Sequence, residues 1–283
     1  MNRKKKFISN SIVHVFLAVL SVIWVLPIIW VVLISFRAEK GAYTSTFLPQ
    51  AYTIDNYVRL FTDTDIFNFP LWFWNTLIVA IFSCIISTFY VLSVSYVMSR
   101  LRFKLRKKFM NIALILGMFP GFMAMIAVYY ILKGVGLTTG ALKLVSLVLV
   151  YSAGSCLLFY VAKGFFDTIP KAIDEAAIID GCTRWQVFTK VIIPLSKPII
   201  VQTIIQAFMA PWMDFIFARV IAGSEPQYYT VAVGLWNMLT KENITNYYTR
   251  FAAGAVIVSI PIAILFCSVQ KYYMESNAGA VKG

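Results

Sequence analysis

The sequence is poor in charged residues, which limits what the chain can be. Only 13% of its 283 residues are charged and 60% are hydrophobic, whereas an ordinary soluble domain is about 25% charged and roughly 45–50% apolar. The chain has a single histidine and no nucleophile–base set, metal cluster or paired carboxylates inside an apolar block. Its four cysteines follow no metal-binding or disulfide spacing. The composition argues against a soluble enzyme and indicates that the bilayer is the solvent.

Motifs for phosphate groups are missing too. No G-x-x-x-x-G-K-S/T segment occurs, and Gly134, Gly136 and Gly140 indicate the turn of a short loop rather than a dinucleotide site. We therefore expect the chain itself to bind no cofactor and no metal. The net charge of +13 does not indicate nucleic acid, because the basic residues lie between apolar blocks rather than along one soluble face.

Long apolar blocks are what the sequence has in abundance. A helix needs about 20 mainly apolar residues to cross the roughly 30 Å hydrocarbon layer, and six blocks reach that length. The sequence predicts an all-α integral membrane protein with six transmembrane helices in one domain, residues 1–283. The first block exceeds the roughly 7–15 residues of a signal-peptide core and is expected to be a retained anchor. The blocks run near Ile12–Phe36, Leu71–Met98, Phe109–Leu132, Leu142–Ala162, Ile199–Ala222 and Phe251–Tyr273.

Basic residues in the connections set the expected orientation. Counted in alternate connections, 17 of the 25 Lys and Arg residues fall on one side and 8 on the other, and the richer side is normally cytoplasmic. Both termini are therefore predicted to be cytoplasmic. Trp72 and Trp74 open the second block on the outer side, where rings often lie at the headgroup boundary. The alternative is that these rings pack against neighbouring helices.

The connection between the fourth and fifth blocks, about residues 163–198, lies on the basic side and is dense in helix signals. Thr168 and Pro170 mark a helix start, because proline is tolerated where the first amide hydrogens are unpaired. The helix is expected to end at about Asp180. Gly181 suits the left-handed residue that follows a helix, since glycine has no Cβ to clash there.

A second short helix is expected after this joint. Thr183 and Gln186 have the spacing of a capping box, and Pro194 and Pro198 are expected to end the helix. Each of the two helices has one apolar face at helical spacing. The pattern leaves open whether these faces lie on the chain's own span ends and lipid or on a partner. The faces consist of Ile169, Ile173, Ala176 and Ala177, and of Trp185, Phe188 and Ile192.

A spaced motif runs through this connection. It comprises Glu175, Ala176, Ala177, Gly181 and Val191–Pro194. The spacing resembles the EAA loop of bacterial ABC importer permeases, E-A-A-x3-G-x9-I-x-L-P. Val191 and Ile193 depart from that pattern but keep an apolar side chain at each position.

In that family the loop is a coupling helix that fits into a cleft of the ATPase subunit. The resemblance implies that ATP and Mg²⁺ are held by partner subunits, so that this chain is not itself an enzyme. It also implies an ATPase-coupling site made of Glu175, Ala176, Ala177, Asp180, Gly181 and Pro194.

The order of elements over nearly the whole chain resembles the carbohydrate-uptake branch of these permeases, of the maltose-transporter type. The likeness includes Trp212 with Asp214, the stretch Tyr229–Gly234 and the ending Gly279–Gly283. It implies a bacterial cell membrane, a second permease subunit, two ATPase subunits, an extracytoplasmic binding protein and an oligosaccharide such as maltodextrin. It further implies that the tail with Lys282 and Gly283 contacts the ATPase.

Asp214 is the notable ionisable group within a block. A carboxylate in a span tends to face a cavity or a partner, and nearby Pro211 favours a kink. Asp214 and Trp212 are therefore candidates for a pore or subunit contact, with a hydrated position near the membrane surface as the alternative. A self-sufficient ion-coupled transporter or channel would depend on Asp214, but this carboxylate and an interfacial His14 form a poor proton relay.

Overall fold

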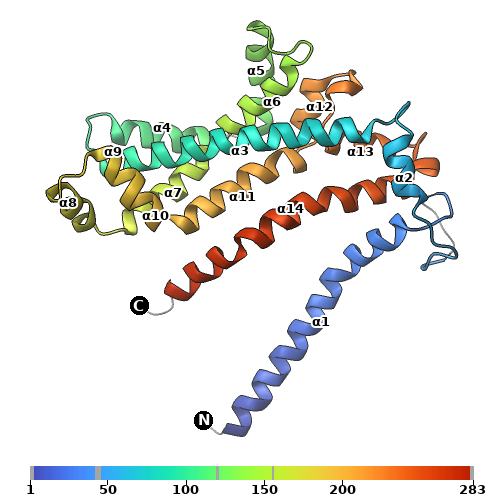
Figure 1. The fold of residues 1–283 in the computed structure, drawn as a ribbon, viewed down its shortest axis with the longest axis horizontal. Helices are drawn as coiled ribbons and strands as arrows, with labels where there is room; N and C mark the ends of the chain where they lie inside the picture. Colours follow the sequence, from blue (N-terminus) through green and yellow to red (C-terminus); the bar gives the residue numbers. More distant parts are fainter. Residues whose placement is uncertain (1–2, 42–45, 119–120, 155, 281–283) are drawn as a thin grey trace. The chain divides into compact units, whose positions relative to one another are not determined.

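All regular structure in the described residues is helical. The structure is a computed structural model that describes residues 3–41, 46–118, 121–154 and 156–280 (Figure 1). Its elements run from α1 (Arg3–Ser35) to α14 (Ile244–Ala280), and an isolated bridge joins Arg37 to Tyr52. The expectation of an all-α chain is confirmed for these residues.

Four stretches of helix are long and apolar enough to cross a membrane, and two bent pairs raise the possible number to six. The four lie in α1, in α3 (Phe69–Arg100), in α6 (Leu142–Ala153) with α7 (Cys156–Thr168), and in α14. The bent pairs are α4 (Arg106–Met118) with α5 (Gly121–Gly134), and the helical run Arg184–Leu195 with α11 (Lys197–Met213). The described helices thus give between four and six spans.

Two of the expected spans are broken rather than continuous. The block Phe109–Leu132 is bent by 106° between α4 and the second half of the pair. Its sequence there reads Pro120-Gly121, a proline that cannot donate a helical hydrogen bond followed by a weak helix former. The block Ile199–Ala222 is divided at Asp214, which has an extended ψ of 122°, into α11 and α12 (Ile216–Ala222).

The chain divides into two compact units, and the first comprises Met1–Pro70 with Leu235–Ile260. Its interior contains Leu60 of α2 (Asp55–Thr62) and Phe69, which are 2% and 0% exposed. The Asn56 amide donates to the carbonyl oxygens of Ser35 and Arg37 at 3.0 and 2.8 Å, and accepts from Thr249 Oγ1 at 2.9 Å. These bonds hold the segment after α1 to the start of α14.

The second unit comprises Leu71–Gly234 with Pro261–Gly283. At one of its ends, the segment leading into α13 (Val231–Met238) packs on the first turns of α3, where the Val231 amide donates to Thr76 Oγ1 at 2.8 Å. Trp72 Nε1 donates to the carbonyl of Pro226 at 2.9 Å, and the ring is 1% exposed. A Cβ on Gly234 would lie 1.9 Å from this ring, so the position requires glycine. Trp72 therefore packs in the interior, whereas Trp74 is 59% exposed and suits the headgroup boundary.

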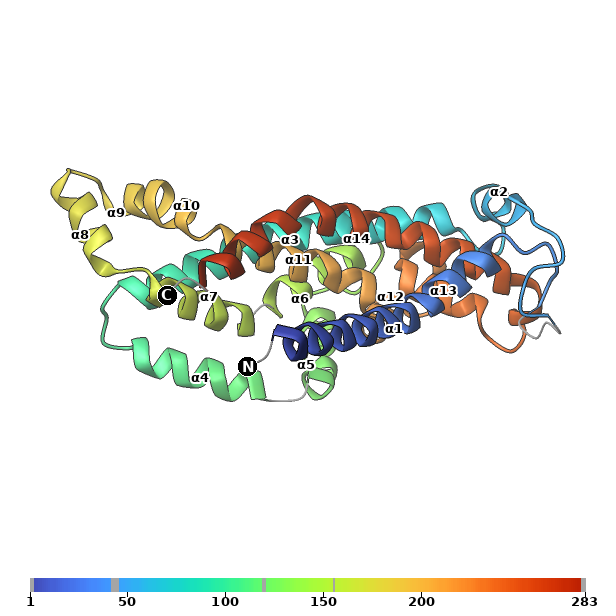
Figure 2. The ribbon, with the colours of Figure 1, turned by 90° about the horizontal axis from the view of Figure 1, so that it is seen from below.

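The other end of the second unit contains the connection with the spaced motif. Figures 1 and 2 show α8 (Lys171–Ile179), α9 (Arg184–Gln186) and α10 (Ile193–Leu195) gathered near the point where α3 ends. A π-helical turn, Val187–Ile192, links α9 to α10. Beneath these short helices is a buried apolar cluster formed by α3, α7 and the π-helical turn, including Val91, Phe166, Val187, Phe188 and Ile192.

Candidate functional site

The helix α8 is closed at its C-terminus by its own backbone. The amide of Cys182 donates to the carbonyl of Ala177, and that of Gly181 donates to the carbonyl of Ile178, both at 3.0 Å. This is the Schellman pattern, which requires a left-handed residue just after the helix. Gly181 provides it with φ of +87°. The expected end of the helix at Asp180 and the glycine joint are confirmed.

The expected capping box is also confirmed. The Thr183 amide donates to Gln186 Oε1 at 2.8 Å, and the Gln186 amide donates to Thr183 Oγ1 at 3.3 Å. The following helical run ends at Leu195, between Pro194 and Pro198, the two prolines that were expected to end it. Pro194 lies in α10, which continues directly from the π-helical turn, and the bend of 82° comes at the break that follows, at Ser196.

Only one side of α8 is packed against the rest of the unit. Ala177 is 9% exposed and lies in the apolar cluster. Ala172, Glu175, Ala176 and Ile179 are exposed and follow the spacing i, i+3, i+4, i+7, which places them on one face of a helix. The sequence pattern grouped Ala176 with Ala177 on one apolar face, but only Ala177 is buried against the described residues, and Ala176 is exposed.

The exposed surface around α8 is apolar as well as uncovered. The side chains of Ile178 and Ile179 are 53% and 84% exposed, and Trp185 of α9 is 64% exposed. Phe188 and Ile192, which were expected to share the face of Trp185, are 7% and 0% exposed. The chain thus anchors these helices through one set of residues and presents another set that no described residue covers.

An ion pair joins α8 to the end of α3. Arg100 Nε lies 2.9 Å from Asp174 Oδ2, and the two side chains are 5% and 15% exposed. Arg100 Nη2 also donates to the carbonyl of Ile169 at 2.9 Å, just before α8 begins. Sequence reasoning used Arg100 only for orientation and did not single out Asp174. The signal available was that Asp174 directly precedes the Glu175 of the motif.

The Arg100–Asp174 pair fixes the position of α8 against α3 but adds little to the net stability of the fold. Burial raises the pKa of Asp174, and this effect outweighs the opposite influence of the Arg100 guanidinium. Such pairs add little net stability, but removing one partner leaves the other buried and uncompensated.

Two further contacts tie the last turns of α3 to this region. Ser99 Oγ donates to Asp167 Oδ1 at 2.6 Å, and Asp167 also pairs with Lys163 on α7. The ring of Tyr96 lies 4.7 Å from that of Phe188, centroid to centroid. Together with the Arg100–Asp174 pair, these contacts couple α8 and its neighbours mechanically to α3.

Asp214 directly follows the C-terminal end of α11, and its carboxylate is hydrogen-bonded within the chain. Its carboxylate accepts from Tyr151 Oη at 2.7 Å and from the amides of Phe217 and Ala218 at 3.3 and 3.0 Å, so it caps the start of α12. Trp212 is 4% exposed, and its indole N–H has no acceptor among the described residues. The pore or subunit role of both residues stays a prediction.

The structure brings some of the predicted site residues together and separates others. Glu175, Ala176, Ala177, Asp180 and Gly181 belong to α8 and its cap. Pro194 follows on α10, whereas Trp212 and Asp214 lie at the other end of α11. Lys282 and Gly283 are outside the described residues.

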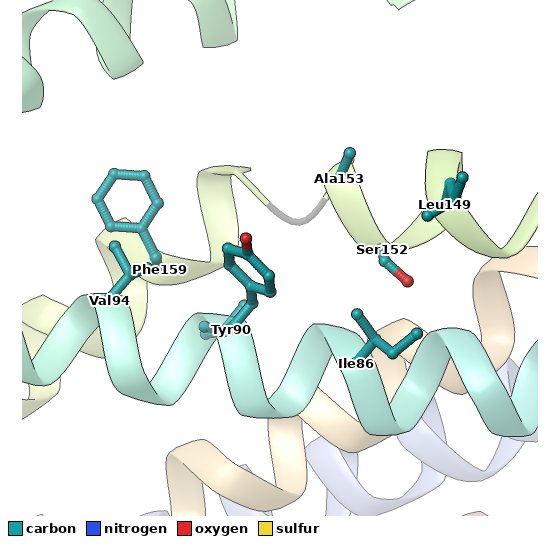
Figure 3. A pocket seen from close by; sticks show the side chains of 8 residues that line it. Ile86, Tyr90, Val94, Leu149, Ser152, Ala153 and Phe159 are labelled. Carbon is teal, nitrogen blue, oxygen red and sulfur yellow. The ribbon is translucent and has the colours of Figure 1, made fainter. Parts of the chain in front are cut away.

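An apolar cavity of 480 Å³ lies between α3 and the junction of α6 and α7 (Figure 3). Its lining is aliphatic and aromatic, with polar atoms from Tyr90 and Ser152. Ser152 Oγ donates to its own helix, at Val148 O. A sugar needs several convergent hydrogen-bonding groups, so this cavity does not indicate direct sugar contact.

The described fold and site define a polytopic helical membrane protein in which one face of α8 is not covered by any described residue. The chain belongs to the family of binding-protein-dependent transport system inner membrane components, whose family model matches residues 92–273. That range includes α8 and the whole spaced motif. The membership places the protein in the bacterial inner membrane as a transport permease.

Relatives of this chain are similar to it over its full length. The galactooligosaccharides transport system permease protein GanQ of Bacillus subtilis is 33% identical over 281 residues, 99% of this chain and 98% of that protein. The maltodextrin transport system permease protein MdxG of the same organism is 33% identical over 100% of both chains. A solved bacterial ABC transporter involved in the import of the acidic polysaccharide alginate has a chain of the same fold, with a TM-score of 0.77, 23% identity, and coverage of 96% of this chain and 99% of that one.

Proposed function

We propose that this chain is one permease subunit of an ATP-driven ABC importer that carries oligosaccharides. Family membership and the full-length likeness to permeases named for maltodextrin and galactooligosaccharides support this class of substrate. The second permease subunit, two ATPase subunits and an extracytoplasmic binding protein would complete the transporter. ATP and Mg²⁺ would bind to the ATPase subunits, which perform the hydrolysis.

The observation that carries the proposal is the outward face of α8. Ala172, Glu175, Ala176 and Ile179 have the spacing with which an amphipathic helix occupies a groove of another protein. The small Ala176 permits close approach of the partner, and Glu175 offers a carboxylate to a basic group at the rim. This face would dock in the ATPase subunit on the cytoplasmic side.

Transmission would run from α8 to α3. The Arg100–Asp174 pair and the bond from Arg100 to the Ile169 carbonyl fix the docked helix to the end of a span. Closure of the ATPase subunits would displace α8 and, through these contacts, α3. Gly181 would keep α8 at a fixed angle to the following helical run.

The proposal also assigns roles to the remaining predicted site residues. Trp212 and Asp214 would contribute to the pore or to the contact with the second permease subunit, at the opposite end of α11 from α8. The tail with Lys282 and Gly283 would contact the ATPase subunits.

The proposal is tested with the assembled complex in proteoliposomes. The variant Ile179→Asp places a charge in the docking face, and an unpaired charge buried at an interface costs about 2 kcal/mol or more. We expect the ATPase activity stimulated by sugar-loaded binding protein to fall at least about tenfold. Val135→Asp is the matched control, because Val135 is an aliphatic residue 66% exposed in the turn after α5. Unchanged stimulation in Ile179→Asp would remove α8 from the coupling role, and uptake without any ATPase would favour an ion-coupled transporter.

A further inference from the structure

A strongly basic cavity lies at the junction of the α3–α4 connection, the start of α4 and α7. Its volume is 630 Å³. Five cationic side chains line it, together with two apolar side chains and one amide, and no acidic residue does. The lining comprises Arg102, Lys104, Arg106, Lys107 and Lys163, with Phe103, Met110 and Asn111.

The positive charge of this basic cavity is largely uncompensated. Lys163 pairs with Asp167 on the same helix, and the Asp167 carboxylate also attracts Arg106 electrostatically without forming an ion pair with it. Arg102, Lys104, Arg106 and Lys107 make no ion pair with any described residue. Four like charges around one cavity repel each other unless an anion lies between them. One carboxylate, Asp167, does not balance five cations, so the cavity favours a further anionic group.

The basic cavity adjoins an exposed apolar stripe. Phe103, in its lining, is 39% exposed. Beyond it on α4, Phe109, Ile112 and Leu116 are 53%, 53% and 61% exposed and lie on one face at the spacing i, i+3, i+7. Met110 is half-buried and packs on the apolar cluster beside α7. The same helix thus offers cations at its first turn and a hydrocarbon surface along its length.

We propose that this cavity binds the phosphate-bearing headgroup of an anionic phospholipid, whose acyl chains lie along the stripe on α4. Cations at the mouth of a span and an adjoining apolar face match the two halves of such a lipid. An inorganic phosphate ion would use only the cations and leave the stripe unused. Arg102 also lines a neighbouring cavity with Glu175 of the docking face, whereas Arg106 and Lys107 do not line that second cavity. The proposal does not depend on the coupling role of α8.

The test measures lipid binding to the purified transporter complex in detergent. Phosphatidylglycerol is titrated, with phosphatidylcholine and inorganic phosphate as comparison ligands, and bound lipid is counted by native mass spectrometry. Since each basic residue near an anionic lipid contributes about a fivefold effect, the double variant Arg106→Gln, Lys107→Gln should bind phosphatidylglycerol roughly thirtyfold more weakly. The matched control is Lys108→Gln, Lys190→Gln, which removes the same charge from two exposed residues outside the cavity. It should bind within about twofold of the unmodified complex.

Several results would contradict the proposed lipid-binding site. Equal losses in the two double variants would mean diffuse attraction to a charged surface. Equal binding of phosphatidylcholine, or displacement of the lipid by millimolar inorganic phosphate, would contradict recognition of an anionic lipid. Release of the ATPase subunits from the first variant with unchanged lipid binding would make the cavity a protein contact. If that variant does not assemble, Lys104→Gln in the exposed connection gives the same test, with a loss of about fivefold expected.

Discussion

Gly181 shows how a single residue controls the geometry of α8. Its φ of +87° is strained for any residue with a Cβ, although no atom lies within 4 Å of where that Cβ would be. We expect Gly181→Ala to destabilise the C-terminal cap of α8 by about 1 kcal/mol or more. Faster amide exchange at Cys182 and through the last turn of α8 would report this change.

Gly164 provides the matched control for that prediction. It lies within α7, where an added Cβ would meet no atom within 4 Å, and its φ is not positive. Gly164→Ala should therefore stabilise its helix by about 0.8–1 kcal/mol. If Gly181→Ala and Gly164→Ala changed stability in the same direction, the open space around the added Cβ, rather than the positive φ of Gly181, would determine the effect at the cap.

At the scale of elements, the link between α3 and α8 depends on one charged pair. Arg100→Met leaves Asp174 buried without its cation, and Asp174→Asn leaves Arg100 without its anion. We expect each single variant to lower both the unfolding temperature and the sugar-stimulated ATPase activity. The double variant should recover stability, with a coupling energy of about 0.5–3 kcal/mol.

The recovery separates the two roles of the pair. The double variant regains stability because no uncompensated charge remains, but α8 and α3 are no longer joined by an ion pair, so stimulation stays low. Additive effects on stability would show that the two side chains do not interact. Full recovery of stimulation would show that packing alone couples the elements.

Local signals predicted the connection with the motif well, and long-range contacts explain what they missed. Gly181 and the Thr183–Gln186 capping box act within a few residues, so the sequence alone reveals them. Arg100 and Asp174 are far apart in the sequence, and periodicity carries no information on such a pair. Hydropathy similarly detected the apolar length of the third block but not its bend, because an apolar helix and two apolar half-helices have the same composition.

At the scale of the whole molecule, the distribution of Lys and Arg residues predicts the orientation of the chain in the membrane. Lys190 lies on the side expected to be cytoplasmic and Lys241 on the opposite side, and both residues are exposed. In a cysteine-free background, Lys190→Cys should react with a membrane-impermeant maleimide in inverted vesicles but not in intact right-side-out vesicles. Lys241→Cys should show the reverse. The opposite labelling would invert the topology and place α8 outside the cell, where no ATPase could reach it.

The closed C-terminus of α8 and its anchorage to Arg100 have a consequence for the energetics of transport. Fixing the backbone of a flexible segment costs about 1–2 kcal/mol of conformational entropy per residue, and α8 has nine residues. The Schellman closure and the two contacts of Arg100 establish its shape before any partner arrives, so association requires little further ordering. Under the proposed coupling role, a preorganised helix would leave most of the free energy of association available to shift the equilibrium between inward-open and outward-open states. A docking helix that folded only on binding its partner would lose much of that free energy to the ordering of its own backbone.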